Sequence, residues 1–152
     1  MAVKNDDISW MKKFPSLKSP DYKVTSVATT DYNCIAWAAG VDDIWWWPHH
    51  DSYWPPKIPR EVKIQSFIDA YQTLGYDVCL SPCLEEGYEK IAIYTKIIDG
   101  KSVPTHAARQ LPDGKWTSKL GSQQDIEHND LNAISGSEYG CAVCFMKRAI
   151  SI

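Results

Sequence analysis

The chain of 152 residues has the length of one ordinary domain and is too short for two well-formed ones. With 44% hydrophobic and 23% charged residues it can bury a core, and no apolar run approaches the roughly 18 residues of a membrane helix. Its 16 basic and 19 acidic residues give a net charge of -3, which excludes a nucleic-acid surface built on positive charge. We therefore expect one domain over residues 1–152, with neither nucleic acid nor membrane as a partner.

The N-terminal segment gives a prediction about the compartment. Residues 1–13, MAVKNDDISWMKK, lack the apolar core of a secretion signal, so we expect a cytoplasmic protein or one delivered without a signal peptide. The five cysteines, an odd number, would then be reduced thiols and not a disulfide framework. Residues 1–29 are expected to form an irregular lead-in that wraps the domain, with Trp10 and Phe14 as its anchors.

A helix is predicted for the segment TTDYNCIAWAAG, residues 29–40. Thr30 or Asp31 can cap its start, and Gly40 lies just past the last apolar residue, where a left-handed conformation suits a helix end. The prolines and aromatic residues of residues 44–59 then forbid a long helix and favour an extended loop.

A second helix is predicted after this loop, because apolar residues recur at spacings of three and four before Gly75. These residues are Ile64, Phe67, Ile68, Tyr71 and Leu74.

The hydrophobic period changes to two after this helix, as in strands. Ile91, Ile93, Thr95 and Ile97 share one face of a strand that ends at an Asp99-Gly100 turn. Further strands are expected at residues 103–111, 115–120 and 141–150, with a weak helical pattern at residues 122–134. The sequence therefore predicts an α+β fold with N-terminal helices packed on an antiparallel sheet.

Cys34 is the candidate nucleophile. It would lie in the first turn of the first predicted helix, where unpaired backbone N–H groups and the helix dipole stabilise a thiolate. The alternative is that Cys34 is a small buried residue on an amphipathic helix.

His106 is the candidate base, in the strand segment VPTHAARQL. Its small neighbours Ala107 and Ala108 leave room for another group beside its ring. The alternative is a histidine with one hydrogen bond at a sheet edge, which Pro104 suggests. The competing histidines are His49, His50 and His128.

The chain resembles the papain-like cysteine peptidases in the order of its elements: a cysteine at a helix start, a second helix, then a histidine on a strand. In size it is most similar to the small bacterial cell-wall peptidases of that superfamily. The segments YNCIAWAAG, WWWP, THAARQLPDGKWTSKLG and DIEH are also similar to an uncharacterised bacterial domain family, over most of residues 30–148. The papain-like resemblance implies a papain-like fold and a cofactor-free hydrolase or acyl transferase for a peptide or amide bond, in a protein or a smaller substrate. Cys34 would attack the carbonyl carbon, and His106 would take the thiol proton and pass it to the leaving group.

The resemblance also implies a third residue on the strand after the histidine, which orients its ring. Ser118 takes that place if residues 112–114 form a three-residue turn, and Lys119 if the turn has two residues. Asp125 or His128 from the following segment could supply the orienting group instead.

Two polar residues beside these positions complete the expected site. No glutamine precedes Cys34 at the usual distance, so the backbone N–H of Cys34 and the side chain of Asn33 are the expected oxyanion donors. Lys119 is either a solvated strand lysine, which is the commoner case, or a lysine turned into the cleft that binds a carboxylate or holds Asp125.

Tryptophan is unusually frequent, and five of the seven fall between Trp37 and Trp54. Three consecutive tryptophans cannot all face one side of an extended segment, so at least one should face a groove or pack under the proline-rich loop. The candidate substrate-binding residues are Tyr32, Trp45, Trp46, Trp47 and Trp116.

Two other functions fit the same residues. The aromatic residues could form a non-catalytic binding module for a protein or sugar partner. A structural zinc site is the further alternative, although adjacent histidines seldom share one ion and Cys141 and Cys144 should point to opposite faces of a strand, so we expect no metal. The possible ligand sets are His49, His50 and Asp51, and Cys79, Cys83, Cys141 and Cys144.

Overall fold

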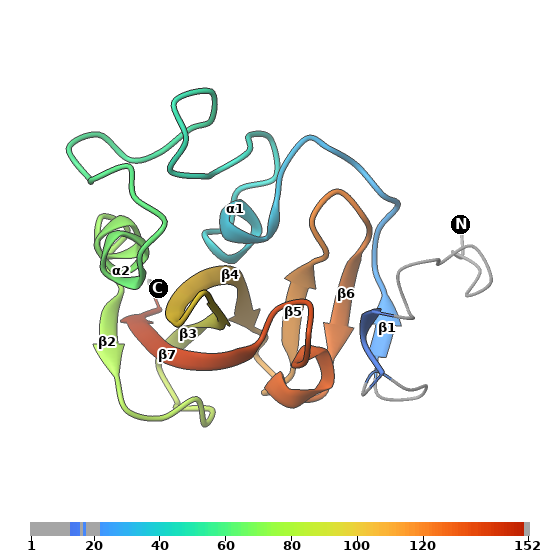
Figure 1. The fold of residues 1–152 in the computed structure, drawn as a ribbon. Coiled ribbons are helices and arrows are strands. Elements are labelled where there is room, and N and C mark those ends of the chain that lie inside the picture. Colours follow the sequence, from blue (N-terminus) through green and yellow to red (C-terminus); the bar gives the residue numbers. More distant parts are fainter. Residues whose placement is uncertain (1–12, 16, 18–21, 151–152) are drawn as a thin grey trace.

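The described strands form one antiparallel sheet in the order β1-β6-β5-β4-β3-β7-β2 (Figure 1). This computed structural model describes residues 13–15, 17 and 22–150, so the expected anchor Trp10 lies outside the described residues. The strands are β1 (Tyr22–Val24), β2 (Asp77–Cys79), β3 (Tyr88–Ile98), β4 (Lys101–Gln110), β5 (Trp116–Lys119), β6 (Asp125–His128) and β7 (Cys141–Ala149).

Helices contribute little to this structure. The helices are α1 (Cys34–Ala38), α2 (Ile64–Gln72) and the 3-10 helix η3 (Leu131–Ile134). Among the described residues α2 alone has seven or more residues, so the predicted α+β, papain-like arrangement of helices packed on a sheet is wrong. One reason is that Asn33 caps α1, not Thr30 or Asp31, so the helix begins later than expected.

The second reason lies in residues 122–134, where a helical pattern was expected. Strand β6 and the short η3 occupy this segment, because β6 pairs with β1 and β5 and Ile126 is fully buried in the sheet. The second predicted helix is confirmed as α2, and the last predicted strand is confirmed as β7.

The two faces of the sheet carry two separate hydrophobic clusters, because successive strand residues alternate between faces. Ile91, Ile93 and Ala107 pack with residues of α1 and α2, and we call this side the α1 face. Ala92, Tyr94 and Ala108 belong to the other cluster, on what we call the opposite face. Phe14, the second expected anchor, is buried in the cluster of the opposite face.

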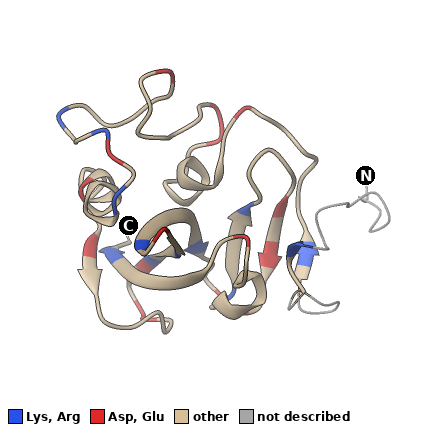
Figure 2. Cartoon of the chain, viewed as in Figure 1, with Lys and Arg blue, Asp and Glu red and all other residues tan. Residues whose placement is uncertain are grey.

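Turns fix the register of the central strands. The Asp99-Gly100 turn is confirmed, with φ of 52° and 76° at its two residues. The Leu111 N–H donates to the Lys115 carbonyl over 2.7 Å, so residues 112–114 form a three-residue turn, in a register that pairs Gln110 with Trp116 and Arg109 with Thr117. Charged residues of both signs are dispersed over these elements (Figure 2). Within the described part of the chain, no helix is long and apolar enough to cross a membrane.

Gly140 lies where the backbone of another strand leaves no room for a side chain. A Cβ there would lie 1.9 Å from the Thr95 carbonyl oxygen, and φ is +75°. We predict that Gly140→Ala lowers the free energy of unfolding by at least about 3 kcal/mol, measured by urea denaturation. Gly121→Ala is the control, because φ is +61° there but nothing lies within 4 Å of the added carbon, and it should cost about 1 kcal/mol. Equal losses in the two variants would contradict this packing.

Candidate functional site

The start of α1 is fixed by the side chain of Asn33. Its Oδ1 accepts hydrogen bonds from the backbone N–H groups of Ala36 (3.2 Å) and Trp46 (3.0 Å), and its Nδ2 donates to the Trp46 carbonyl (2.6 Å). Asn33 is therefore a helix cap that also connects the proline- and tryptophan-rich loop of residues 44–59 to α1. This amide is committed to backbone partners and is poorly placed to serve as an oxyanion donor.

The Cys34 thiol faces the α1 face of the sheet. It is 5% exposed and packs in the cluster that contains Ile93 and Ala107, with its Sγ 4.0 Å from the Thr105 carbonyl oxygen. Burial raises the pKa of the Cys34 thiol to about 11, although the Ala107 backbone and the charge of Lys119 act in the other direction. Desolvation thus outweighs the helix start, and the thiol is protonated at neutral pH.

His106 lies on the opposite face of the sheet from Cys34. It precedes Ala107 in β4, and its cross-strand partner is Tyr94, whose ring belongs to the cluster of the opposite face. The ring centroids of Tyr94 and Tyr139 lie 5.2 and 4.1 Å from that of His106. The structure therefore does not bring the thiol and the imidazole together, because the backbone of β4 separates them.

Ser118 does lie beside His106, as the three-residue turn predicts. The Ser118 Oγ is 2.9 Å from the His106 Nε2 and 2.8 Å from the His128 Nε2. The His128 Nδ1 in turn lies 2.8 Å from the Asp130 carbonyl oxygen. We call this buried chain of three side chains the histidine relay.

The Asp130 carbonyl sets the direction of every hydrogen bond in the histidine relay. A carbonyl only accepts, so the His128 Nδ1 carries a proton and the Nε2 of the neutral ring accepts from the Ser118 hydroxyl. Ser118 then accepts from the protonated Nε2 of His106, which leaves the His106 Nδ1 with a lone pair. That nitrogen is buried and has no hydrogen-bond partner in the described structure.

Both relay histidines are held neutral by their surroundings. Burial lowers the pKa of His128 to about 4, although Asp130 acts in the other direction. Burial and then His128 lower the pKa of His106 well below its ordinary value. The relay is therefore uncharged at neutral pH, and Ser118 bridges the rings of His106 and His128 on the opposite face of the sheet.

Lys119 and Asp125 lie on the α1 face, so Asp125 does not orient His106. Lys119 is fully buried and donates to the carbonyls of Thr29 (2.8 Å) and Gln123, so the interpretation as a solvated lysine is wrong. The Tyr32 hydroxyl donates to the Asp125 Oδ2 over 2.6 Å, and its ring centroid lies 5.1 Å from the Lys119 Nζ. Burial lowers the pKa of Lys119 and raises that of Asp125.

The loop tryptophans mostly support the core. Trp46 is buried in the cluster of the α1 face, and the half-buried Trp47 packs edge-on against Phe67 with centroids 5.4 Å apart. Trp45 is half-buried as well. Trp116 lies elsewhere, on the opposite face.

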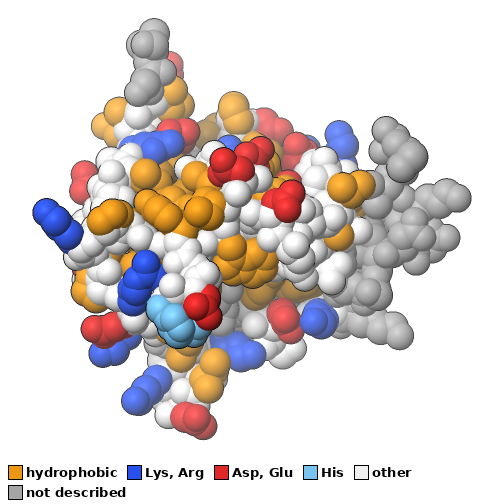
Figure 3. All heavy atoms as spheres, turned by 90° about the horizontal axis from the view of Figure 1, so that it is seen from above, with side chains coloured by type: hydrophobic (Ala, Val, Ile, Leu, Met, Phe, Trp, Pro, Cys, Tyr) orange, Lys and Arg blue, Asp and Glu red, His pale blue; other side chains and the backbone are white. Residues whose placement is uncertain are grey.

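The predicted metal ligands come together only in part. The ligand atoms of His49, His50 and Asp51 lie within 4.8 Å of one another on an exposed turn, and Figure 3 shows histidine at the surface. No other group of three such residues converges in the described part of the chain, so the four-cysteine set is not assembled there. All five cysteines are free.

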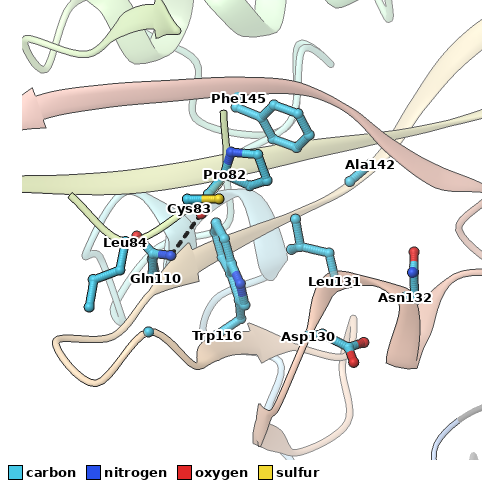
Figure 4. A pocket seen from close by; sticks show the side chains of 11 residues that line it. Pro82, Cys83, Leu84, Gln110, Trp116, Asp130, Leu131, Asn132, Ala142 and Phe145 are labelled. Atoms are coloured by element: carbon cyan, nitrogen blue, oxygen red, sulfur yellow. Dashed lines mark hydrogen bonds between the residues drawn. The ribbon is translucent and has the colours of Figure 1, made fainter. Parts of the chain in front are cut away.

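A groove on the opposite face was not foreseen from the sequence. Its volume is about 360 Å³, and Figure 4 shows it between the β2–β3 loop, β7, η3 and the β4–β5 hairpin. The lining residues include Pro82, Gln110, Trp116, Leu131, Ala142 and Phe145.

Gln110 is a buried polar residue that lines this groove. It is 7% exposed, and its Nε2 donates to the Pro82 carbonyl over 2.9 Å. Its Oε1 is buried and has no partner in the described structure. The signal in the sequence was a glutamine that shares the strand period of Ala108 and pairs with Trp116 across the turn.

We predict that stability falls with acidification because of the histidine relay. The unfolded chain binds protons below the ordinary histidine pKa of 6.5, whereas folded His128 stays neutral down to about pH 4, so unfolding gains protons as the pH drops through this window. One pKa unit corresponds to about 1.4 kcal/mol, so His128 alone should remove about 3 kcal/mol between pH 6.5 and 4. Urea denaturation across this range measures the loss.

Two variants identify the source of this dependence. His128→Gln should be less stable at pH 7 but should lose less on acidification, because the titrating ring is gone. His50→Gln removes a ring whose side chain is 80% exposed and should leave the pH dependence unchanged. An unchanged slope in His128→Gln would contradict the neutral relay.

Comparison with known proteins identifies the family of this chain. No curated protein and no solved structure matches the chain. A family model described as "Domain of unknown function (DUF7689)" matches residues 23–147. Because this match covers far more than half of the 152 residues, the chain belongs to the DUF7689 family.

Proposed function

We propose that this protein is a non-catalytic binding module for a protein partner. The observation that carries the proposal is the position of Cys34 and His106 on opposite faces of β4. A thiol–imidazole pair needs hydrogen-bond reach between sulfur and nitrogen. Because side chains alternate along β4, the backbone of this strand lies between the Cys34 thiol and the His106 ring.

Burial supports the same conclusion for each group. The Cys34 thiol is protonated and packed among apolar side chains, where a substrate carbonyl has no approach. The free lone pair of His106 faces the interior, and the ring of Tyr139 stacks on the imidazole with planes 14° apart. Neither group has the solvent access that a nucleophile and its base require.

The groove supports a binding role. It combines the aromatic side chains of Trp116 and Phe145 with an unpaired polar atom of Gln110, and binding sites commonly join apolar walls to a few polar groups. Ligand exchange in such a groove needs no contribution from Cys34, because that residue lies across the sheet.

We predict that Cys34 is silent toward iodoacetamide in the folded protein below pH 8. Cys83 and Cys141 are exposed and should be alkylated, whereas Cys34 should react only after unfolding in urea. Peptide mapping by mass spectrometry gives the modified fraction of each cysteine. Faster labelling of Cys34 than of Cys83 in the folded state would overturn the proposal and favour a cysteine hydrolase.

A second prediction locates the binding activity. Immobilised peptide and glycan arrays probed with Ala142→Trp should lose the peptide signals of the wild-type chain, because the indole would fill the groove that Ala142 lines. Val143→Trp is the matched control, since Val143 is 50% exposed and does not line the groove. Cys34→Ala should bind as the wild type does. Signals that survive in Ala142→Trp, or vanish in Cys34→Ala, would contradict the proposed site.

A further inference from the structure

The side-chain oxygen of Gln110, Oε1, indicates what kind of group the groove binds. A buried acceptor without a donor costs free energy, so an occupant that supplies an N–H or O–H donor is favoured there. The amide orientation is fixed by the Pro82 carbonyl, which requires the Nε2 side to face it. The unpaired atom of Gln110 is therefore an acceptor, and the group that it would bind is a donor.

The charge of the groove lining also favours an occupant that donates hydrogen bonds, and in particular a cation. Asp130 is the one ionisable carboxylate among the lining residues, and no lysine or arginine lines the groove in the described structure. The Asp130 side chain accepts from the Ala133 N–H as the cap of η3, so its position at the rim is fixed. An anionic occupant would find no counter-charge here, whereas a cation would find one.

The aromatic walls suit an apolar stem that ends in a cation. Trp116 and Phe145 offer π faces or edges to such a group, and tryptophan is the best partner in cation–π contacts. Leu131 and Ala142 add an aliphatic surface along the groove. The long hydrocarbon stems of lysine and arginine match this surface.

We propose that the groove binds the ammonium or guanidinium head of a basic side chain, with its stem against the aromatic walls. This inference rests on the proposed binding function and names the chemistry of its ligand. The head group donates to the Gln110 Oε1, and the Asp130 carboxylate supplies the negative charge among the lining residues.

Access to the Gln110 Oε1 requires part of the groove lining to move. The Oε1 is sealed from solvent, so an occupant must displace a lining group to reach it. Leu84 is suited to turn outward, because it is 53% exposed and sits in the loop that forms one wall.

The test titrates small probes into the full ¹⁵N-labelled chain and follows the Gln110 amide and Trp116 indole resonances. The basic probes are Nα-acetyl-lysine and Nα-acetyl-arginine methylamide, and their neutral matches carry norleucine and citrulline. Basic probes should bind at least about tenfold more tightly than their neutral matches, because a charge-assisted hydrogen bond is lost in the latter. Cadaverine tests a free amine as the source, and methyl glucoside tests a sugar.

Variants assign the contacts. Gln110→Met should weaken the basic probes about tenfold, because it keeps the bulk but removes the acceptor. Asp130→Asn keeps the helix cap and should weaken them about fivefold, with a reduced dependence on salt. Asp113→Asn is the matched control: Asp113 is exposed, its side chain likewise accepts a backbone N–H, and it does not line the groove. It should leave affinity unchanged.

The outcomes separate this inference from the proposed function. Equal binding of neutral and basic probes would overturn the cationic ligand and leave the proposed protein-binding function intact. Binding of methyl glucoside alone would overturn the cationic ligand and the protein partner together. Tighter binding of cadaverine than of the amino-acid probes would overturn the basic side chain as the ligand and assign the site to free amines. No shift with any probe, in a chain that folds, would overturn the inference. Rapid alkylation of Cys34 is the separate result that would overturn the proposed function.

Discussion

The alternation of side chains along β4 is the constraint on which the rest of the site depends. His106 and Ala108 point to the opposite face of the sheet, whereas Ala107 between them points to the α1 face. The Cys34 thiol meets only the methyl side and the strand backbone. A thiol–imidazole pair would need the strand to shift by one residue, which would also exchange the two hydrophobic clusters between the faces.

Burial then decides the protonation state of each polar group within this frame. A helix start favours a thiolate, but for Cys34 the cost of desolvating a charge is larger, and the pKa of its thiol rises to about 11. The same cost keeps both relay histidines neutral, because their pKa values fall. Position along a helix and position within a core thus act in opposite directions here, and the core has the larger effect.

Much of the sheet could be predicted because the period of two and the turn residues are local signals. The turn at residues 112–114 fixed the register that puts Ser118 beside His106, and that contact follows from counting residues. The face that α1 covers is not a local signal, so the sequence could not place Cys34 across the strand from His106. Strand β6 was missed because DIEH carries a single strongly apolar residue, Ile126, and its burial depends on the neighbouring strands.

The relay and the groove meet at Asp130, and this junction gives the buried histidines a structural purpose. The Asp130 carbonyl accepts from His128, its carboxylate caps η3, and the same residue forms part of the groove rim. The Leu131 carbonyl is held in turn by the Tyr94 hydroxyl over 2.7 Å, and Tyr94 packs against the relay ring of His106. Two buried donors therefore anchor the wall of the groove to the centre of the sheet. A site held in this way would lose little conformational freedom if a ligand entered, which would lower the entropic cost of binding.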